Sequence, residues 1–170
     1  MGVITLKSHV RRAIEFFNKE TIYIGLGGLD PWDYEPSGEV LVPSPTPTDG
    51  ISDVFVYGHI VSKMLVYPDP EGELSYRGYT FSISSEENAY ANAARWVYTS
   101  FEFRYDEAPL ETYRKVGIYS GLTLAPATPT KRIYVPSEVQ DEGVLEYLMH
   151  VVPIVRTANK IDRAIIILSF

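Results

Sequence analysis

Acidic and histidine side chains are the residues of this sequence that could do chemistry, but their spacing matches no catalytic motif. His9, His59 and His150 lie far apart and lack the H-E-x-x-H spacing of zinc hydrolases. There is also no G-x-S-x-G segment of the kind that presents a nucleophilic serine. Two carboxylates that converge only in the fold, such as Glu102 and Asp106, leave a polysaccharide hydrolase open as a hypothesis. Because no motif supports catalysis, we expect a protein that is not an enzyme and holds no metal.

A glycine-rich segment follows the first expected strand, as in many nucleotide-binding loops. In Gly25-Leu-Gly27-Gly28-Leu-Asp30, an aspartate stands where the G-x-G-x-x-G pattern requires its third glycine. Pro31 and Trp32 follow and lead into a loop, not into the helix whose amino end would hold a phosphate. We therefore interpret these glycines as permitting a turn or a close backbone approach, and we expect no cofactor.

Charge and cysteine content exclude several further classes of protein. The 15 basic and 22 acidic residues give a net charge of −7, and no basic run is longer than two residues. A surface that follows a phosphate backbone is therefore not expected, which argues against nucleic-acid binding. The absence of cysteine excludes disulfides and thiolate nucleophiles. The longest apolar run is far shorter than the about 20 residues of a membrane span, and we expect a soluble protein made in the cytoplasm.

The elements that must position these residues begin with a helix and an arm. Apolar residues recur at helical spacing over about residues 5–18, so residues 1–20 are predicted to form an N-terminal amphipathic helix. A strand follows, and residues 30–50 then contain five prolines, which favour an extended arm that lies on a partner or links two elements. The alternative is that Trp32 packs back on its own sheet. The candidate partner-contact residues on the arm are Trp32, Tyr34, Pro43, Pro45 and Pro47.

Residues 51–170 are predicted to form a β-rich body within a single domain that spans residues 1–170. About seven strand-like runs are separated by turns that contain glycine and proline. Ser84 and Glu87 have the spacing of a capping box, which predicts a short peripheral helix at about residues 85–94. Because the strands do not alternate with helices, the predicted class is α+β and β-rich: a layered, mainly antiparallel β-sandwich with the N-terminal helix and one short peripheral helix.

The end of the chain is its most apolar part. Ala164 to Leu168 is an unbroken apolar run, and Phe170 follows two residues later. Such a run is typical of a central strand that is covered on both faces. We therefore expect the C-terminal residues to be architecture and partner contacts to lie on the arm and the loops.

Tyrosine is abundant, with 13 residues, and its role is not decided by composition. Tyrosine is enriched in β-rich proteins, where its ring packs on a half-buried sheet. It is also enriched at protein interfaces, because an apolar ring carries a polar hydroxyl. The sequence leaves both interpretations open.

Several blocks of sequence occur in an order that resembles a known family. They are the helix ending in Glu15-Phe-Phe-Asn18, Thr21-Ile-Tyr-Ile-Gly25, Pro31-Trp32, Pro47-Thr-Asp49, Tyr113-Arg-Lys-Val-Gly-Ile-Tyr-Ser120, Gly143-x-Leu-Glu-Tyr147, Val152-Pro-Ile154, Asn159-Lys-x-Asp-Arg163 and Ile165-Ile-Ile-Leu-Ser-Phe170. This ordered set resembles a wedge subunit of the contractile-tail baseplate of bacteriophages, in the family that forms two-fold dimers on the outer part of the wedge. The match covers roughly residues 5–50 and 110–170, whereas the middle agrees only in strand character.

The resemblance implies a structural role and no catalysis. It implies a layered β-sandwich without enzymatic activity or cofactor, located in the virion tail baseplate after synthesis in the host cytoplasm. The implied partners are other baseplate wedge and tail proteins and a second copy in a homodimer, with no nucleic acid and no membrane insertion. Longer family members carry more sequence between the first and last blocks than this chain does.

A binding module is the alternative to a scaffold. Trp32, Trp96 and the many tyrosines could stack on sugar rings, as expected of a tail-associated receptor- or carbohydrate-binding protein. The sequence alone does not separate this alternative from a baseplate protein.

Overall fold

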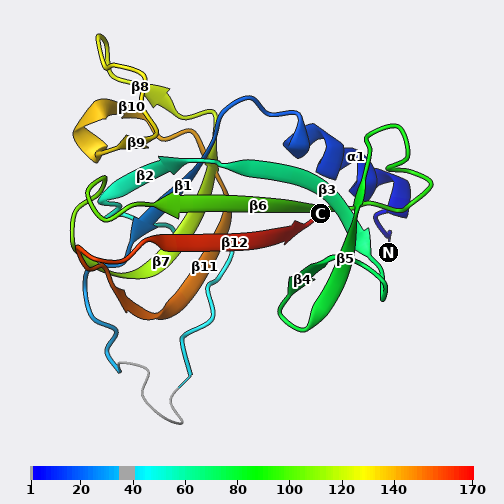
Figure 1. Ribbon diagram of the computed structural model, residues 1–170, viewed down its shortest axis with the longest axis horizontal. Helices are drawn as coiled ribbons and strands as arrows, with labels where there is room; N and C mark the ends of the chain where they lie inside the picture. The colour runs from blue at the N-terminus through cyan, green and yellow to red at the C-terminus, as the bar shows by residue number, and fades with distance from the viewer. Residues whose placement is uncertain (1, 35–40) are drawn as a thin grey trace. The chain divides into compact units, whose positions relative to one another are not determined.

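Two units, each built around a five-stranded sheet, make up the chain (Figure 1). The computed structural model describes residues 2–34 and 41–170, so residues 35–40 of the predicted arm lie outside the described residues. Unit 1 comprises the residues up to Glu20, Ile60–Phe101 and Ala164–Phe170, and unit 2 comprises Thr21–His59 and Glu102–Arg163. The single domain expected from the sequence stays a prediction.

The predicted N-terminal helix is confirmed as α1, Leu6–Phe17, in unit 1. Thr5 caps it, because its side-chain oxygen accepts a hydrogen bond from the Ser8 amide at 3.4 Å. Apolar residues three apart then lie on one face of the helix and are buried. These buried residues are Val10, Ala13 and Phe16.

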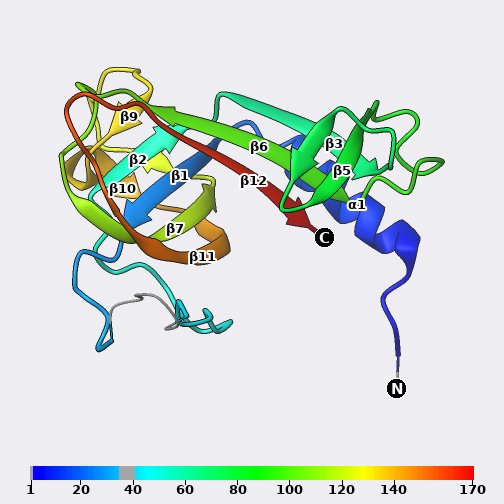
Figure 2. The ribbon, with the colours of Figure 1, turned by 60° about the horizontal axis from the view of Figure 1, so that its bottom comes forward.

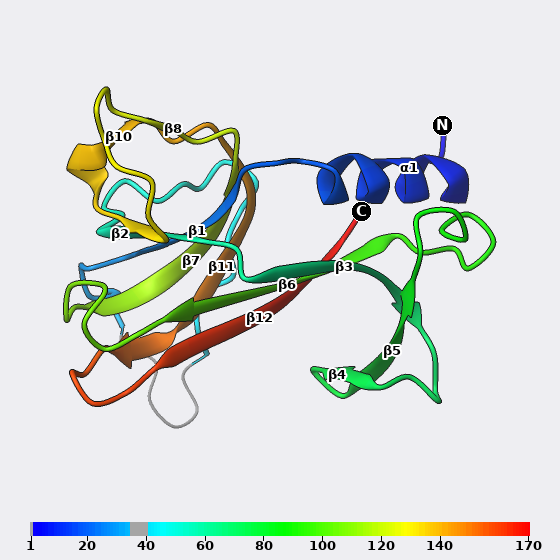
Figure 3. The ribbon, with the colours of Figure 1, turned by 45° about the horizontal axis from the view of Figure 1, so that its top comes forward.

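The sheet of unit 1 has the strand order β12-β6-β3-β5-β4, and α1 runs alongside β3 (Figure 3). Its strands are β3 (Ser62–Pro68), β4 (Leu74–Tyr76), β5 (Tyr79–Ser84), β6 (Trp96–Phe103) and β12 (Asp162–Ser169). The last two residues of β6 and the first two of β12 belong to unit 2. Successive side chains of a strand point to opposite faces, so each face of this sheet carries its own set of residues.

The short helix predicted at residues 85–94 does not form, and consecutive turns occupy this segment. The amide of Asn88 bonds to the carbonyl three residues back, that of Asn92 four residues back and that of Ala94 five residues back. Ala93 has a φ of 53°, which a right-handed helix does not allow. The capping signal in the sequence therefore starts a chain reversal that is not continued as a helix.

The apolar C-terminal run forms β12, but β12 is an edge strand, so the prediction of a central strand was wrong. Ile166 and Leu168 are buried, whereas Ile165 is 46% exposed. The ring of Phe170 lies 5.2 Å from that of Phe16 in α1, so the end of the chain is held by the helix. An apolar run indicates that the side chains of a strand are buried, but it does not indicate whether the strand pairs with one neighbouring strand or with two.

Unit 2 holds a second five-stranded sheet, of order β11-β7-β1-β2-β9, and a small two-stranded sheet (Figures 1 and 2). The large sheet contains β1 (Ile22–Gly27), β2 (Val56–His59), β7 (Thr112–Ser120), β9 (Ile133–Tyr134) and β11 (Val144–Val155). The small sheet pairs β8 (Thr123–Leu124) with β10 (Val139–Asp141). A 3-10 helix, η1 (Pro136–Glu138), directly precedes β10. Strand pairing in unit 2 is antiparallel. Strands as short as β8 and β9 leave no periodic pattern, which is why the sequence did not predict them.

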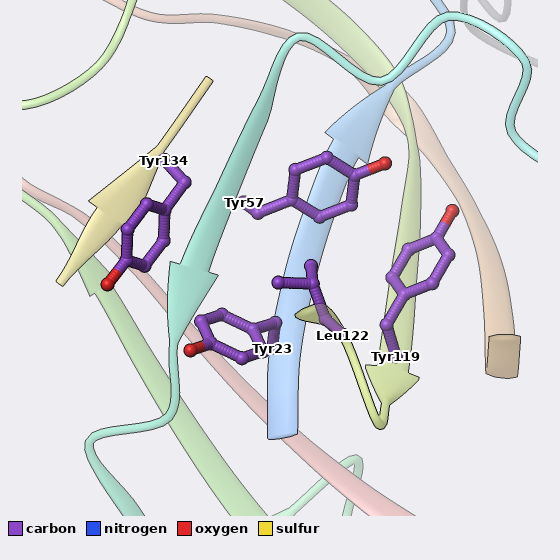
Figure 4. Close-up of a cluster of buried hydrophobic side chains, with 5 residues drawn as sticks. All are labelled: Tyr23, Tyr57, Tyr119, Leu122 and Tyr134. Atoms are coloured by element: carbon purple, nitrogen blue, oxygen red, sulfur yellow. The ribbon is translucent and has the colours of Figure 1, made fainter. Parts of the chain in front are cut away.

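Tyrosines gather on one face of the large sheet of unit 2 (Figure 4). The rings of Tyr57 and Tyr119 meet edge to face at 5.5 Å. Leu124 of β8 and Val139 of β10 pack against the cluster from the small sheet. The buried members of this tyrosine cluster are Tyr23, Tyr57, Tyr119, Leu122 and Tyr134. The predicted class, an α+β, β-rich, mainly antiparallel and layered fold, is confirmed.

Gly25 makes room for this tyrosine cluster. A Cβ atom at Gly25 would lie 2.7 Å from the ring of Tyr119 and 3.4 Å from that of Tyr57. Burial raises the pKa of both phenols, and the hydroxyl of Tyr57 donates a hydrogen bond to Glu142 at 2.9 Å. The interpretation of the glycine-rich segment as a close backbone approach is therefore confirmed at Gly25.

Candidate interaction surface

The two described ends of the arm are anchored to unit 2. Gly28 has a φ of 74°, and the amides of Gly28 and Leu29 donate to the carboxylate of Asp53 at 2.9 and 2.6 Å. The buried guanidinium of Arg114 donates to the carbonyl of Leu29 at 2.9 Å. At the other end, Lys115 donates to the carbonyl of Gly50 at 3.4 Å. The amides that a phosphate would need are thus already occupied by a carboxylate from the same chain.

Electrostatics favours the ionised form of Asp53. Partial burial acts to raise the pKa of its carboxyl group, but the hydrogen bonds from Gly28 and Leu29 outweigh burial and hold the pKa below its usual range. The positive charge of Lys115 acts in the same direction. Asp53 therefore remains a negative anchor for the arm at neutral pH.

Trp32 packs against its own sheet. Its ring lies 4.8 Å from that of His150 on β11, and the ammonium group of Lys115 lies 5.8 Å from the indole centre. Lys115 and His150 face each other across the pairing of β7 with β11. The Nδ1 of His150 in turn donates to the carbonyl of Pro43 at 2.8 Å. His150 thus contacts both described parts of the arm, at Trp32 and at Pro43.

A tight turn in the arm lies beside β11. The amide of Thr46 donates to the carboxylate of Asp49 at 2.7 Å, and the amide of Asp49 donates back to the carbonyl of Thr46 at 3.1 Å. The Thr46 hydrogen bond, with a smaller effect of His150, lowers the pKa of Asp49. Between this turn and β11 lies a groove of about 310 Å³. Its lining residues are Pro45, Thr46, Pro47, Asp49, Leu145, Glu146, Tyr147 and Leu148.

The structure separates the five candidate contact residues into two groups. Trp32 is half-buried, and Pro43 is held through its carbonyl, so both connect the arm to β11. Tyr34 is 81% exposed, and Pro45 and Pro47 are also exposed. Leu41, which the sequence did not single out, is 86% exposed. Whether these residues touch a partner stays a prediction.

Four anchoring residues were missed by the sequence reasoning: Asp53, Arg114, Lys115 and His150. Each lies far in the sequence from the arm residue that it holds, and the fold brings them together. The spacing of His150 from the other histidines argued against a metal site, and nothing in the sequence indicated its contact with the arm. The signal that could have revealed this site is the pair of polar residues, Lys115 and His150, at opposite positions of two neighbouring strands. That pair is recognised only once the register of β7 and β11 is known.

Glu102, one of the two carboxylates considered for a hydrolase site, forms two ion pairs. Glu102 contacts Arg104 at 3.2 Å and Arg163 at 3.1 Å, and its hydrogen bond from Arg104, together with that from Arg163, lowers the pKa of the carboxyl group. A general acid requires the opposite, a carboxyl group whose pKa is raised by an apolar surrounding. The geometry at Glu102 therefore resembles a surface ion pair and not a catalytic acid.

A second polar cluster is buried in unit 2. The guanidinium of Arg156 is fully buried over the ring of Phe103, lies 3.6 Å from Asp162 and donates to the carbonyl of Arg104 at 3.0 Å. Burial, with the nearby charge of Asp162, raises the pKa of the Tyr113 hydroxyl to about 12. This phenol stays protonated at neutral pH and is not a nucleophile, so the cluster is structural: it ties the end of β11 to the start of β12.

Two kinds of feature are absent from residues 2–34 and 41–170. Within these ranges, no group of three or more histidine or acidic side chains is arranged to hold a metal ion. In the same part of the chain, no helix is both long enough and apolar enough to cross a bilayer.

Comparison with known proteins agrees with the resemblance seen in the sequence. A model of the family described as "Baseplate wedge 3 tail fiber network component" matches residues 1–170. "Virion protein 3" of Enterococcus phage phiEF24C is 29% identical over 154 residues, which cover 86% of this chain and 83% of that protein. The predicted relation to a phage baseplate wedge is thereby confirmed.

Proposed function

The chain belongs to the family of baseplate wedge 3 tail fiber network components, and on that premise we propose that it joins neighbouring proteins of a contractile-tail baseplate. As a member of this family it is a structural protein of the phage particle. The finer proposal concerns its contacts: it mediates assembly through the arm of unit 2 and has no catalytic activity.

The observation that carries this proposal is the way the arm is presented. Its ends are anchored by Asp53, Arg114 and Lys115, while Tyr34 and Leu41 are more than four-fifths exposed. An anchored segment loses less conformational entropy on binding than a free one, so its exposed side chains bind a partner at lower cost. Tyrosine is among the residue types that dominate binding energy at protein interfaces.

Co-assembly measurements test the proposal. The full-length protein would be mixed with each protein encoded beside it in the tail gene cluster, purified singly, and complexes would be detected by light scattering after size exclusion. The double variant Tyr34→Ser with Leu41→Ser is expected to weaken binding about tenfold or more. Tyr105→Ser with Leu110→Ser is the matched control, because these residues of unit 2 are about half exposed and belong to the connection between β6 and β7, not to the arm. A wild-type protein that binds none of these partners would contradict the proposal.

The family resemblance also motivates a proposed homodimer. Light scattering of the isolated protein tests it, and a single mass near the 19.2 kDa of one chain at all concentrations would count against it. The carbohydrate-binding alternative loses support at Trp32, since that ring packs at a tilt against His150 and is partly buried.

A further inference from the structure

One face of the sheet in unit 1 is apolar, and several of its side chains are exposed. The pairing of β3 with β5 and β6 puts Val66 opposite both Ile83 and Trp96, and the pairing of β4 with β5 puts Tyr76 opposite Tyr79. Residues directly opposite each other share a face. This aromatic face consists of Met64, Val66, Leu74, Tyr76, Tyr79, Phe81, Ile83, Trp96, Tyr98, Ile165 and Ile167.

The other face of the same sheet has a partner. There Leu65, Val97 and Ile166 are at most 1% exposed. Phe16 of α1 and Phe170 of the C-terminus pack together at 5.2 Å, and α1 contacts β3. An antiparallel sheet with one covered face normally carries polar residues on the other. In unit 1 both faces are apolar, which is the pattern of a sheet covered on both sides.

The aromatic face remains exposed in the isolated chain. Tyr79 is 70% exposed, Ile83 56% and Ile165 46%, while Val66 and Phe81 lie buried between their neighbours. The rings of Phe81 and Trp96 meet edge to face at 6.3 Å, so the larger side chains form one contiguous surface. Contiguous exposed apolar patches on soluble proteins mark binding sites.

Two arginines border this surface. The guanidinium of Arg77 lies 5.3 Å from the ring centre of Tyr76, and that of Arg95 lies 4.5 Å from that of Trp96. The aromatic face carries no charged side chain until Glu102 of β6 and Arg163 of β12, which pair with each other at 3.1 Å. Apolar and aromatic residues at the centre, depletion of charge there and arginine at the border are the composition of a protein interface. A complementary partner therefore presents an apolar centre bordered by carboxylates.

We propose that the aromatic face of unit 1 docks a neighbouring baseplate protein through an apolar surface bordered by acidic residues. This inference rests on the proposed function and adds a second surface to the arm. A sugar is the less suitable occupant, because sugar hydroxyls need polar partners between the rings. Met64, Ile83 and Ile165 lie between the rings instead, and the two serine hydroxyls on the same face, those of Ser62 and Ser100, bond to each other at 2.6 Å.

Paired surface variants test the docking. With the same purified tail proteins as probes, Tyr79→Ser with Ile83→Ser is expected to weaken one complex at least tenfold. Val61→Ser with Tyr90→Ser is the matched control, because these unit 1 residues are 56% and 50% exposed and lie off the aromatic face. The control is expected to bind as the wild type does. Melting curves of both double variants verify that they remain folded.

Charge reversal tests the stated chemistry of the partner. Arg77→Glu is expected to weaken the same complex about tenfold and to reduce its salt dependence, whereas Arg12→Glu on α1 leaves both unchanged. If the Tyr79 and Ile83 variant binds every probe normally while the arm variant does not, the docking inference is wrong and the proposed function stands. Protection of Trp96 by a soluble oligosaccharide, or loss of a homodimer in the same variant, would also overturn the inference in favour of a sugar or a second copy.

Discussion

In unit 2 a cluster of tyrosines on the large sheet lies beneath a second, smaller sheet, whereas Tyr79 on the sheet of unit 1 is exposed. Tyr119 is 1% exposed and Tyr79 is 70% exposed, although both occupy strands. The two interpretations of a tyrosine-rich composition, core and interface, therefore hold at different places in one chain. A tyrosine in a strand becomes core only where another layer covers it, and the coverage comes from β8 and β10, which are too short to be seen in the sequence.

The largest expected effect comes from deleting Ala164–Phe170, which tests whether the α1-facing side holds unit 1 together. The deletion removes Ile166 and Leu168, which are 0% and 3% exposed. Each large apolar side chain contributes about 1.5–3 kcal/mol when buried, against a total stability of about 5–15 kcal/mol. We expect loss of cooperative thermal unfolding by circular dichroism. A truncated protein that melts near the full-length temperature would contradict the assigned role of β12.

The covered tyrosines of unit 2 are tested by Tyr119→Ala. Removing this ring leaves a cavity between the two sheets, and we expect a loss of about 3–5 kcal/mol in the free energy of unfolding. Urea denaturation measures it. Tyr119→Phe is the control, since it keeps the ring and should cost about 1 kcal/mol or less. Equal losses in the two variants would mean that the hydroxyl, and not packing, stabilises the tyrosine cluster.

A smaller loss is expected from overfilling the same layer. Gly25→Val places methyl groups where the rings of Tyr119 and Tyr57 already lie, and overpacking typically costs about 1–3 kcal/mol. Combining it with Tyr119→Ala should restore part of the stability, because the deleted ring frees the required space. Additive losses in urea denaturation would show that Gly25 is needed for another reason.

The arm anchor should matter less for stability than the tyrosine layer. Asp53→Asn weakens the hydrogen bonds to Gly28 and Leu29 and is expected to cost about 1 kcal/mol at pH 7. The folded pKa of Asp53 is lowered, so its contribution is present above the unfolded pKa of about 3.9 and is lost as the pH falls through the folded value. Denaturation of both proteins at pH 7 and below pH 3 should show the difference shrinking. A gap that is equally wide in acid would refute this account.

The smallest effect is expected on the open face. Tyr79→Ala removes a ring that is 70% exposed, and we expect the free energy of unfolding of the isolated chain to change by no more than about 0.5 kcal/mol. Urea denaturation of Tyr79→Ala and Tyr119→Ala side by side compares the free energy of unfolding lost at an exposed tyrosine with that lost at a buried one. A loss comparable to that of Tyr119→Ala would mean that the face is already covered in solution.

Local patterns predicted those parts of the fold that depend on neighbouring residues. The periodicity of α1 and the alternation in β6 follow from interactions within a few residues, and both were visible in the sequence. The family was also visible, because the order of blocks from Glu15 to Phe170 is a property of the sequence itself. The helix predicted at residues 85–94 failed because a local capping signal was not supported by the packing around Ala93 and Ala94.

The tertiary structure alone decided which strands are neighbours and which faces are covered. It made β12 an edge strand and brought His150 and Lys115 to Trp32. It also placed the carboxylate of Asp53 where it accepts hydrogen bonds from the amides of Gly28 and Leu29. These contacts join residues that are tens of positions apart, so their free energy depends on strand register and not on local preference. The sequence by itself determined the class of fold and the family, and three-dimensional pairing determined which tyrosines became core and which remained available to a partner.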